Sequence, residues 1–156
     1  MSLLRNSIFT IMAVALTLAS CNRQTIYSHY ESISTEGWER GDYKDFCIAI
    51  REDGTYTETI GLRSTRVYPF TNISVIVSQQ ARLSGVQRVD TLNITLTGED
   101  GNEIGQGINY LQMDVPLATI GLQAGDSVHV SIRHYMAKEV LPGITDIGFS
   151  MKKTDK

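Results

Sequence analysis

The sequence lacks the residue patterns on which most catalytic and metal-binding sites depend. It contains three histidines, two cysteines and one tryptophan in 156 residues. No Gly-x-Ser-x-Gly, Cys-x-x-Cys or His-Glu-x-x-His motif occurs, and there is no phosphate-binding glycine loop. The lysines and arginines are scattered and form no basic stripe, which argues against nucleic-acid binding. We therefore expect no enzymatic activity, no cofactor and no metal ion.

The three histidines are too dispersed to share a metal ion. His129 and His134 are five residues apart on one expected strand, so their side chains point to opposite faces of a sheet. His134 stands among apolar residues and is interpreted as a core histidine rather than a ligand. His29 lies near the beginning of the folded region and is expected to be solvated.

Two acidic clusters, residues 52–54 and residues 99–102, also need an interpretation. The second offers oxygen ligands of the kind that calcium prefers, but Ile104 stands where a third ligand would be required. Asp, Asn and Gly are favoured in the tight turns between strands. Both clusters are therefore predicted to be hairpin turns.

No apolar run in the sequence is long enough to cross a membrane. Ile8–Leu18 is about half of the roughly 20 residues that a membrane-spanning helix needs. It follows Arg5 and ends in small residues, an order typical of a signal peptide, here residues 1–20. The segment Leu18-Ala19-Ser20-Cys21 resembles the lipobox at which bacterial lipoprotein signal peptidase cleaves, which makes Cys21 the lipidated residue. The alternative is an ordinary secretory signal followed by a chance cysteine.

Lipidation at Cys21 predicts a firmly anchored, single-domain protein. The thiol would carry a diacylglycerol, and the new amino terminus would carry an acyl chain such as palmitate. Together these are three chains, and two are enough for stable anchoring. Removing residues 1–20 leaves 136 residues, with a formal charge of about −4. We expect residues 21–27 to be the lipidated cysteine and a short tether, and residues 28–153 to be the domain. Cys47 is then the only other thiol, so no internal disulfide forms, and its apolar surroundings predict a buried, inert side chain.

Alternation with a period of two dominates the sequence from residue 28 onward. Leu92, Ile94 and Leu96 alternate with polar residues, as in a half-buried strand. Strands are expected at Phe46–Ile50, Thr55–Arg63, Ile73–Gln80, Thr91–Thr97, Ile104–Met113 and Ser127–Met136, with Ile147, Phe149 and Met151 on the apolar face of a last strand. Turn residues separate these segments, and Pro69, Pro116 and Pro142 fall between them. The pattern predicts an all-β fold, a single antiparallel β-sandwich of the immunoglobulin-like or jelly-roll-like kind.

Aromatic residues are the best candidates for an exposed recognition surface. Core packing is expected for most of them, but Tyr135 has the polar parity of its strand and is predicted to be exposed. Trp38, between charged neighbours, is ambiguous. We take Trp38, Arg133 and Tyr135 as the possible partner or ligand surface.

Two tripeptides, Asp90-Thr91-Leu92 and Asp126-Ser127-Val128, resemble the O-glycosylation acceptor pattern of exported Bacteroidetes proteins. Glycosylation of Thr91 or Ser127 is a hypothesis that this resemblance suggests.

Several spaced segments together resemble the gliding-motility lipoprotein H family of Bacteroidetes. They are Leu62-Arg63 followed by Tyr68-Pro69-Phe70-Thr71-Asn72-Ile73, then Asp90-Thr91-Leu92, Asp100-Gly101 with Gly105-Gln106-Gly107, Gly125 through Ile132 to Met136, and Leu141-Pro142-Gly143-Ile144-Thr145-Asp146-Ile147-Gly148. The chain departs from the family pattern at Ile104, where an aromatic residue is common, and at Arg133-His134-Tyr135-Met136, where Glu-Gln often precedes Ala-Met.

The resemblance implies an envelope lipoprotein associated with the gliding machinery and its linked secretion system, without enzymatic activity and with envelope proteins as partners. Residues 22–25 carry no acid, whereas surface export in this phylum is associated with an acidic signal close behind the lipidated cysteine. We therefore expect the domain to sit at the outer membrane and to face the periplasm. A lipid-anchored glycan-binding module is the alternative function, and a hydrolase with two carboxylates across a cleft is a third.

Overall fold

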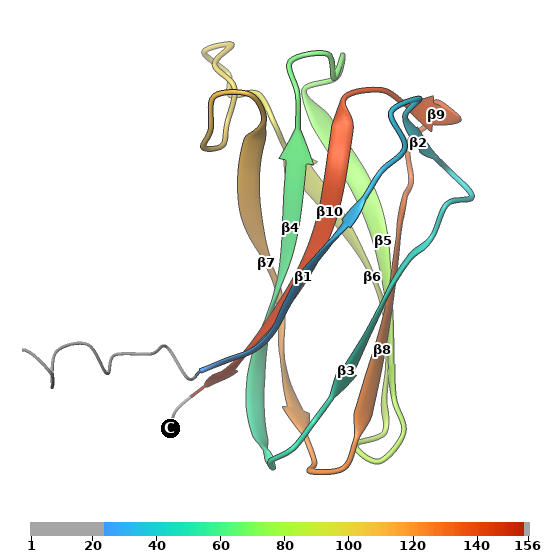
Figure 1. Ribbon diagram of the computed structural model, residues 1–156, viewed down its shortest axis with the longest axis vertical. Helices are drawn as coiled ribbons and strands as arrows, with labels where there is room; N and C mark the ends of the chain where they lie inside the picture. The colour runs from blue at the N-terminus through green and yellow to red at the C-terminus, as the bar shows by residue number, and fades with distance from the viewer. Residues whose placement is uncertain (1–23, 155–156) are drawn as a thin grey trace, which may run out of the picture.

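The structure, a computed structural model, describes residues 24–154 as a sandwich of two antiparallel sheets (Figure 1). The first sheet has the strand order β1-β10-β4-β7 and the second has the order β3-β8-β5-β6. A two-stranded ribbon, β2-β9, lies beside them. The strands are β1 (Thr25–Ser32), β2 (Trp38–Glu39), β3 (Lys44–Ala49), β4 (Gly54–Ser64), β5 (Asn72–Ala81), β6 (Val86–Thr95), β7 (Leu111–Leu122), β8 (Ser127–His134), β9 (Val140–Leu141) and β10 (Ile144–Thr154). In the described range no helix is long and apolar enough to span a bilayer.

The core lies between the two sheets and follows the predicted alternation. In β8, Val128, Val130 and Ile132 are fully buried, as expected from their parity. The apolar face of β10 is buried as well, with Ile147, Phe149 and Met151 turned inward. Burying one such side chain stabilises the fold by roughly 1.5–3 kcal/mol, so the packing of the two apolar sheet faces against each other holds the sandwich together. The all-β sandwich prediction is confirmed.

The strand predicted at Ile104–Met113 is wrong. Residues 104–110 form a loop, and β7 begins only at Leu111. Gly105 and Gly107 adopt φ values of 134° and 139°, which are incompatible with a continuous strand. Pro116 was expected between strands but lies inside β7, at an edge of the first sheet, where the register with β4 shifts. An edge strand tolerates proline because the missing N–H would have no neighbour to bond.

Three other expectations need correction. Cys47 is exposed rather than buried, because Phe46 and Ile48 take the inward positions of β3. Residues 52–54 do not form a hairpin turn, since β3 belongs to the second sheet and β4 to the first. β1 begins at Thr25, inside the expected tether of residues 21–27.

A buried polar pair interrupts the apolar core. Glu58 of β4 is fully buried, and Gln79 of β5 donates from Nε2 to its Oε2 at 2.8 Å. Burial raises the pKa of Glu58, while the bond from Gln79 and the nearby Arg88 oppose this rise. The remaining oxygens, Glu58 Oε1 and Gln79 Oε1, have no hydrogen-bond donor among the described residues. A protonated Glu58 is the form that suits this site, because it supplies a donor where none exists.

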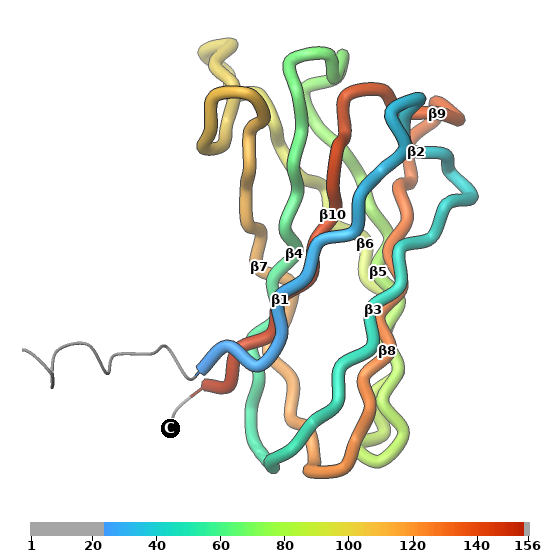
Figure 2. The backbone as a smooth tube through the Cα atoms, viewed as in Figure 1, coloured from blue at the N-terminus to red at the C-terminus, as the bar shows by residue number. Residues whose placement is uncertain are grey.

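The sandwich has two distinct ends. One, which we call the far end, consists of residues 33–43, 65–71, 96–110 and 135–143 at the top of Figure 1. The other, the near end, consists of residues 50–53, 82–85 and 123–126. At the near end the Asp126 carboxylate accepts backbone N–H groups of Leu83, Ser84 and Ser127 at 2.9–3.2 Å. β1 begins low on the sandwich beside the last residues of β10 and runs toward the far end (Figure 2).

Candidate functional site

Trp38 is not part of an exposed surface, contrary to the prediction. Its exposed fraction is 0%, and its indole Nε1 donates to the Asp42 carbonyl oxygen at 2.9 Å. The ring packs edge-on against His134, with 5.5 Å between the centroids. Trp38 pairs with Leu141 in the β2-β9 ribbon, which places it over the far end of the core. Each strand of this ribbon has only two residues, which is too short for a sequence pattern to predict the pairing.

Arg133 and Tyr135 do lie on an exposed surface. The Arg133 guanidinium carbon is 5.8 Å from the centroid of the Tyr135 ring and 5.8 Å from that of Tyr43. Tyr135 is 61% exposed and Tyr43 is 54% exposed. The sequence did not single out Tyr43, and only the pairing of β3 with β8 brings it beside Arg133. The predicted surface therefore becomes a Tyr43–Arg133–Tyr135 cluster, and Cys21 lies outside the described residues.

The histidines are placed as expected. His134 is fully buried and its Nδ1 accepts the Met136 N–H at 3.4 Å. Burial lowers the pKa of His134, so the neutral ring is the favoured form at neutral pH. His129 is exposed on the opposite face of β8, and His29 is exposed on β1. Within residues 24–154 no three His, Cys, Asp or Glu side chains gather in a way that could hold a metal ion.

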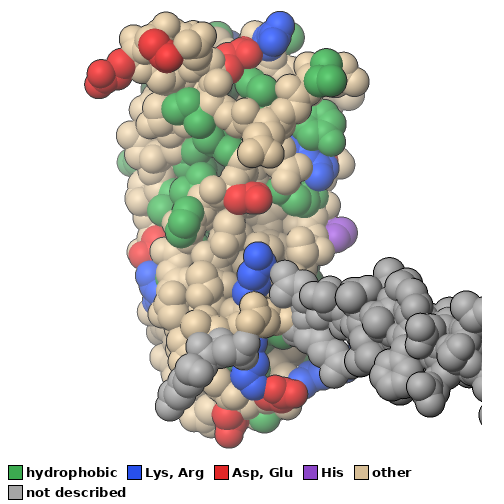
Figure 3. Space-filling view, turned by 90° about the vertical axis from the view of Figure 1, so that its left-hand side faces the viewer, with side chains coloured by type: hydrophobic (Ala, Val, Ile, Leu, Met, Phe, Trp, Pro, Cys, Tyr) green, Lys and Arg blue, Asp and Glu red, His purple; other side chains and the backbone are tan. Residues whose placement is uncertain are grey.

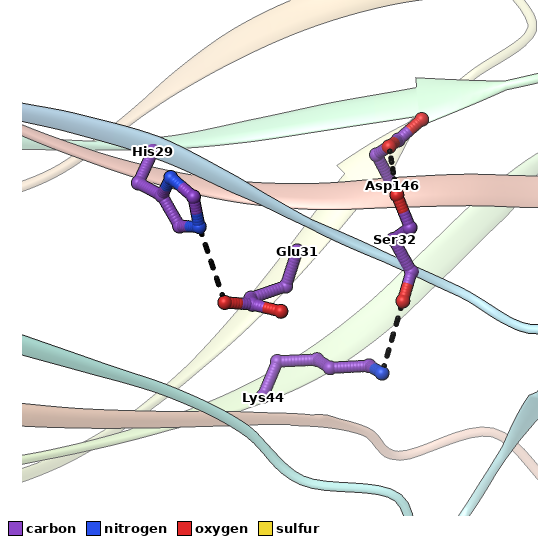
Figure 4. Close-up of polar contacts among 5 residues, drawn as sticks. All are labelled: His29, Glu31, Ser32, Lys44 and Asp146. Atoms are coloured by element: carbon purple, nitrogen blue, oxygen red, sulfur yellow. Dashed lines mark hydrogen bonds and ion pairs between the residues drawn. The ribbon is translucent and has the colours of Figure 1, made fainter.

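Residue types found in hydrolase triads meet where β1 faces β3, but their geometry is not catalytic (Figure 4). Ser32 Oγ donates to Asp146 Oδ1 at 3.1 Å, whereas His29 Nε2 lies 3.2 Å from Glu31 Oε1. His29 and Ser32 are three residues apart on one strand, so they point to opposite faces. Lys44 Nζ donates to the Ser32 carbonyl oxygen at 3.1 Å. This cluster joins the two sheets, and the Ser32 hydroxyl bonds to a carboxylate with no histidine between them, so it is not the arrangement of a catalytic triad.

A tyrosine bridge crosses the outer face of the first sheet. Tyr30, Gly148, Gly61 and Asp114 stand in one register row across β1, β10, β4 and β7. Because both central residues are glycines, the Tyr30 ring lies flat over their backbone, and its hydroxyl donates to Asp114 Oδ1 at 3.3 Å. Burial, together with the Asp114 carboxylate, raises the pKa of Tyr30 to about 12. The bridge links the two edge strands of the sheet without passing through the core.

Arg63 is held between two tyrosine rings on the same face. Its guanidinium carbon lies 4.0 Å from the Tyr30 centroid and 5.2 Å from the Tyr110 centroid. Nε of Arg63 donates to Gln112 Oε1 at 3.0 Å. Sequence reasoning missed this cluster because Tyr30 and Tyr110 are 80 positions apart in the chain.

A cavity of about 890 Å³ adjoins this cluster, beneath the loop that joins β6 to β7. Gln106, Asn109 and Gln112 contribute carboxamides to its lining, Asp114 contributes a carboxylate and Tyr110 an aromatic ring. Arg63 and Tyr30 do not line it but fix the position of Tyr110 and Asp114. The arrangement is one of binding groups, with no nucleophile paired to a base in this lining.

Exposed hydrophobic side chains gather at the far end. Ten large hydrophobic residues of the described range are exposed, and seven belong to the far end, namely Tyr43, Val67, Phe70, Ile104, Ile108, Tyr110 and Tyr135. Ile108 is the extreme case, at 95% exposed. Figure 3, a view onto the side where β7 lies, shows hydrophobic side chains mainly in the upper half of that face.

Three of the five segments that suggested a family resemblance reach loops or turns at the far end, namely those around residues 68–73, 100–107 and 141–148. The Thr65 N–H donates to the Gly143 carbonyl oxygen at 2.7 Å, which joins the β4–β5 loop to the β9–β10 turn. Arg66 and Glu103 form an ion pair at 3.1 Å, which joins the β4–β5 loop to the β6–β7 loop. Residues widely separated in sequence therefore build one surface.

Comparison with known proteins identifies the family of this chain. The family model of the GldH lipoprotein matches residues 25–151. Gliding motility lipoprotein GldH of Flavobacterium johnsoniae is 26% identical, covering 97% of this chain and 99% of the relative, and the GldH homolog of Christiangramia forsetii is 26% identical, covering 96% of each chain. Among solved structures, a family 35 carbohydrate binding module of Clostridium thermocellum is 10% identical, with a TM-score of 0.41, and the match covers 80% of this chain and 89% of that one. The family 35 module of Cellvibrio japonicus Abf62 is 15% identical, with a TM-score of 0.42, and the match covers 80% of this chain and 77% of that one. These structural likenesses, with TM-scores below 0.5, carry no functional inference. The match over most of the chain shows that the protein belongs to the GldH lipoprotein family.

Proposed function

We propose that this protein is a non-catalytic component of the gliding-linked envelope assembly, anchored by a lipid on Cys21, and that its far end contacts an envelope protein. The family is one of lipoproteins of the gliding system. The observation that supports the contact surface is the gathering of seven of the ten exposed large hydrophobic residues at one end. Large exposed apolar patches are typical of protein–protein contacts.

β1 begins low on the sandwich, away from the far end that carries the proposed contact surface (Figure 2). Four residue steps separate Cys21 from Thr25, the first residue of β1, and such a segment spans at most about 14 Å. β10 has 11 residues, which corresponds to a length of about 36 Å. In this proposal the near end stays close to the membrane and the far end reaches a partner about one domain length away.

The experiment that tests the contact surface uses two matched valines. Val67 lies in the far end and is 68% exposed, while Val89 lies on the second sheet away from that end and is 71% exposed. A photo-crosslinking amino acid is placed at each position in the native host, and crosslinked proteins are identified by mass spectrometry. We expect position 67, and not position 89, to capture an envelope protein. Val67→Ser should then weaken co-purification of that protein, and Val89→Ser should not.

Equal capture at both positions, or capture at neither, would refute the proposed surface. The wild-type fold is retained in both variants by design, since each side chain is mostly in solvent and makes little core contact. A loss of co-purification with Val89→Ser alone would place the partner on the second sheet instead.

The proposed orientation at the outer membrane, facing the periplasm, has its own test. Cys47 is an exposed free thiol on β3, and in a lipidated chain the Cys21 sulfur is blocked. A membrane-impermeant maleimide should therefore label Cys47 only after the outer membrane has been permeabilised. Labelling of intact cells would show that the domain faces outward, and the Cys47→Ser variant controls for other sites.

A further inference from the structure

We propose that the cavity beneath the β6–β7 loop binds a neutral oligosaccharide. The sequence leaves a glycan-binding module as an alternative to a protein-contact domain, and such a module needs aromatic rings beside acidic or amide side chains. Tyr30 of the first sheet and Tyr110 of the β6–β7 loop flank Arg63 beside Gln112 and Asp114, and so meet this need. The cavity shares Ile104, Ile108 and Tyr110 with the far end but not Val67, and the two tests use different ligands, so either proposal can fail without the other.

The cavity is preformed because its loop is held in place by backbone hydrogen bonds. Gln106 and Gln112 exchange two such bonds, each 2.9 Å long. Nearer the beginning of the loop, the Ile104 N–H donates to the Leu96 carbonyl oxygen at 2.8 Å. A Cβ on Gly107 would collide with the Tyr110 carbonyl oxygen, so the tight turn depends on glycine there. A preformed site avoids the entropy cost of ordering a loop on binding.

The chemistry of the lining selects the ligand class. The carboxamides of Gln106 and Asn109 each offer a donor and an acceptor. Gln112, whose Oε1 accepts from Arg63, offers its amide donors, and Asp114, whose Oδ1 accepts from Tyr30, offers Oδ2 as an acceptor. Asp114 is the only formally charged residue in the lining, and no cation lines it. Phosphorylated or carboxylated ligands therefore find no counter-charge there. Hydroxyl groups, which both donate and accept, match this set.

Tyr110 supplies the apolar surface that a sugar ring requires. Its side chain is 43% exposed, and the Arg63 guanidinium lies 5.2 Å from its centroid on one side. Arg63 is itself fixed by the Tyr30 ring and by Gln112. A rigid tyrosine ring can bury the apolar face of a sugar at little cost in conformational entropy, while its hydroxyl stays hydrated. A volume of about 890 Å³ falls within the range of small-ligand pockets.

The test uses the purified lipidated protein in a detergent that has no sugar headgroup. An array of neutral gluco-, manno- and xylo-oligosaccharides is screened together with acidic oligogalacturonides and a set of unrelated peptides. Titration calorimetry then gives Kd for the strongest neutral ligand with wild type and with variants. Tyr110→Ala removes the aromatic surface, and Asn109→Ala removes one carboxamide without touching Arg63.

Val89→Ala is the control, because Val89 is an exposed apolar side chain on the second sheet, outside the cavity and the far end. We expect a neutral oligosaccharide to bind, Tyr110→Ala to raise Kd about tenfold or more, and Val89→Ala to leave Kd unchanged. Trp38 fluorescence confirms that each variant is folded. The proposal is overturned if no neutral oligosaccharide binds at about 10 mM, if only acidic sugars or peptides bind, or if Tyr110→Ala and Asn109→Ala leave Kd unchanged.

Discussion

The tyrosine bridge predicts an unusual response to substitution of a strand glycine. A Cβ added at Gly61 would lie 2.6 Å from Tyr30 Cζ and still closer to the hydroxyl oxygen. Gly61→Ala must therefore displace the Tyr30 ring from its place. By contrast, a Cβ at Gly121, on β7 of the same sheet, would meet nothing within 4 Å. Gly121→Ala is thus a matched control.

The magnitude follows from what the displaced ring loses. Tyr30 stacks on Arg63 at 4.0 Å, an interaction that is typically about 0.5–1 kcal/mol at a partly exposed site. Its hydrogen bond to Asp114 adds about 1 kcal/mol. With the apolar area of the ring, we expect Gly61→Ala to lower the free energy of unfolding by about 2–3 kcal/mol. Gly121→Ala should be neutral or should stabilise by about 0.5–1 kcal/mol, because glycine is unfavourable inside a strand.

A double-mutant cycle separates the collision from other effects. In a Tyr30→Ala background the three atoms nearest to the added Cβ are gone, so Gly61→Ala should become neutral or stabilising, and the sign of its effect reverses. Urea unfolding of the mature chain, followed by the fluorescence of the single, fully buried Trp38, measures each variant. The reasoning is refuted if Gly61→Ala is as well tolerated as Gly121→Ala, or if its cost persists without Tyr30.

Three further outcomes are expected. Burial raises the pKa of Glu58, so its contribution to stability is complete below the ordinary glutamate pKa and is lost as the pH rises through the raised value. Glu58→Gln should flatten this loss in urea titrations at several pH values, and an unchanged profile would contradict the buried pair. Burial alone would raise the pKa of Asp126, but hydrogen bonds from Ser84, Leu83 and Ser127 outweigh burial and lower this pKa. The stabilisation that the Asp126 carboxylate provides is therefore present above the ordinary aspartate pKa and is lost on acidification. Asp126→Ala should therefore cost about 1–3 kcal/mol at pH 7 and progressively less as the pH falls below the ordinary aspartate pKa, with a pH-independent cost as the contrary result. Trp38→Ala should cost about 3–5 kcal/mol and broaden the thermal transition seen by circular dichroism, whereas a surface tryptophan would be nearly neutral.

Much of the architecture was predictable from the sequence because strand parity is a local property. The alternation in Ser127–His134 and in Ile147–Met151 identified which side chains face the core, and the structure agrees. The family was also recognisable from spaced segments, since those segments keep their order along the chain. Cys47 was expected to be buried because its neighbours are apolar, but it stands between two inward residues of β3 and so points outward, as strand alternation requires.

The candidate site was beyond the reach of sequence reasoning, because it depends on which strands become neighbours. Tyr30 reaches Asp114 because β1, β10, β4 and β7 lie side by side and the two residues between them in the same row are glycines. Trp38 is buried because a two-residue ribbon closes over the core. The alternation of apolar and polar residues is a property of each strand's own sequence, whereas strand order and register result from how the two apolar faces pack against each other. The sequence alone thus determined a lipoprotein-family β-sandwich, and the tertiary structure decided where its surface chemistry gathers.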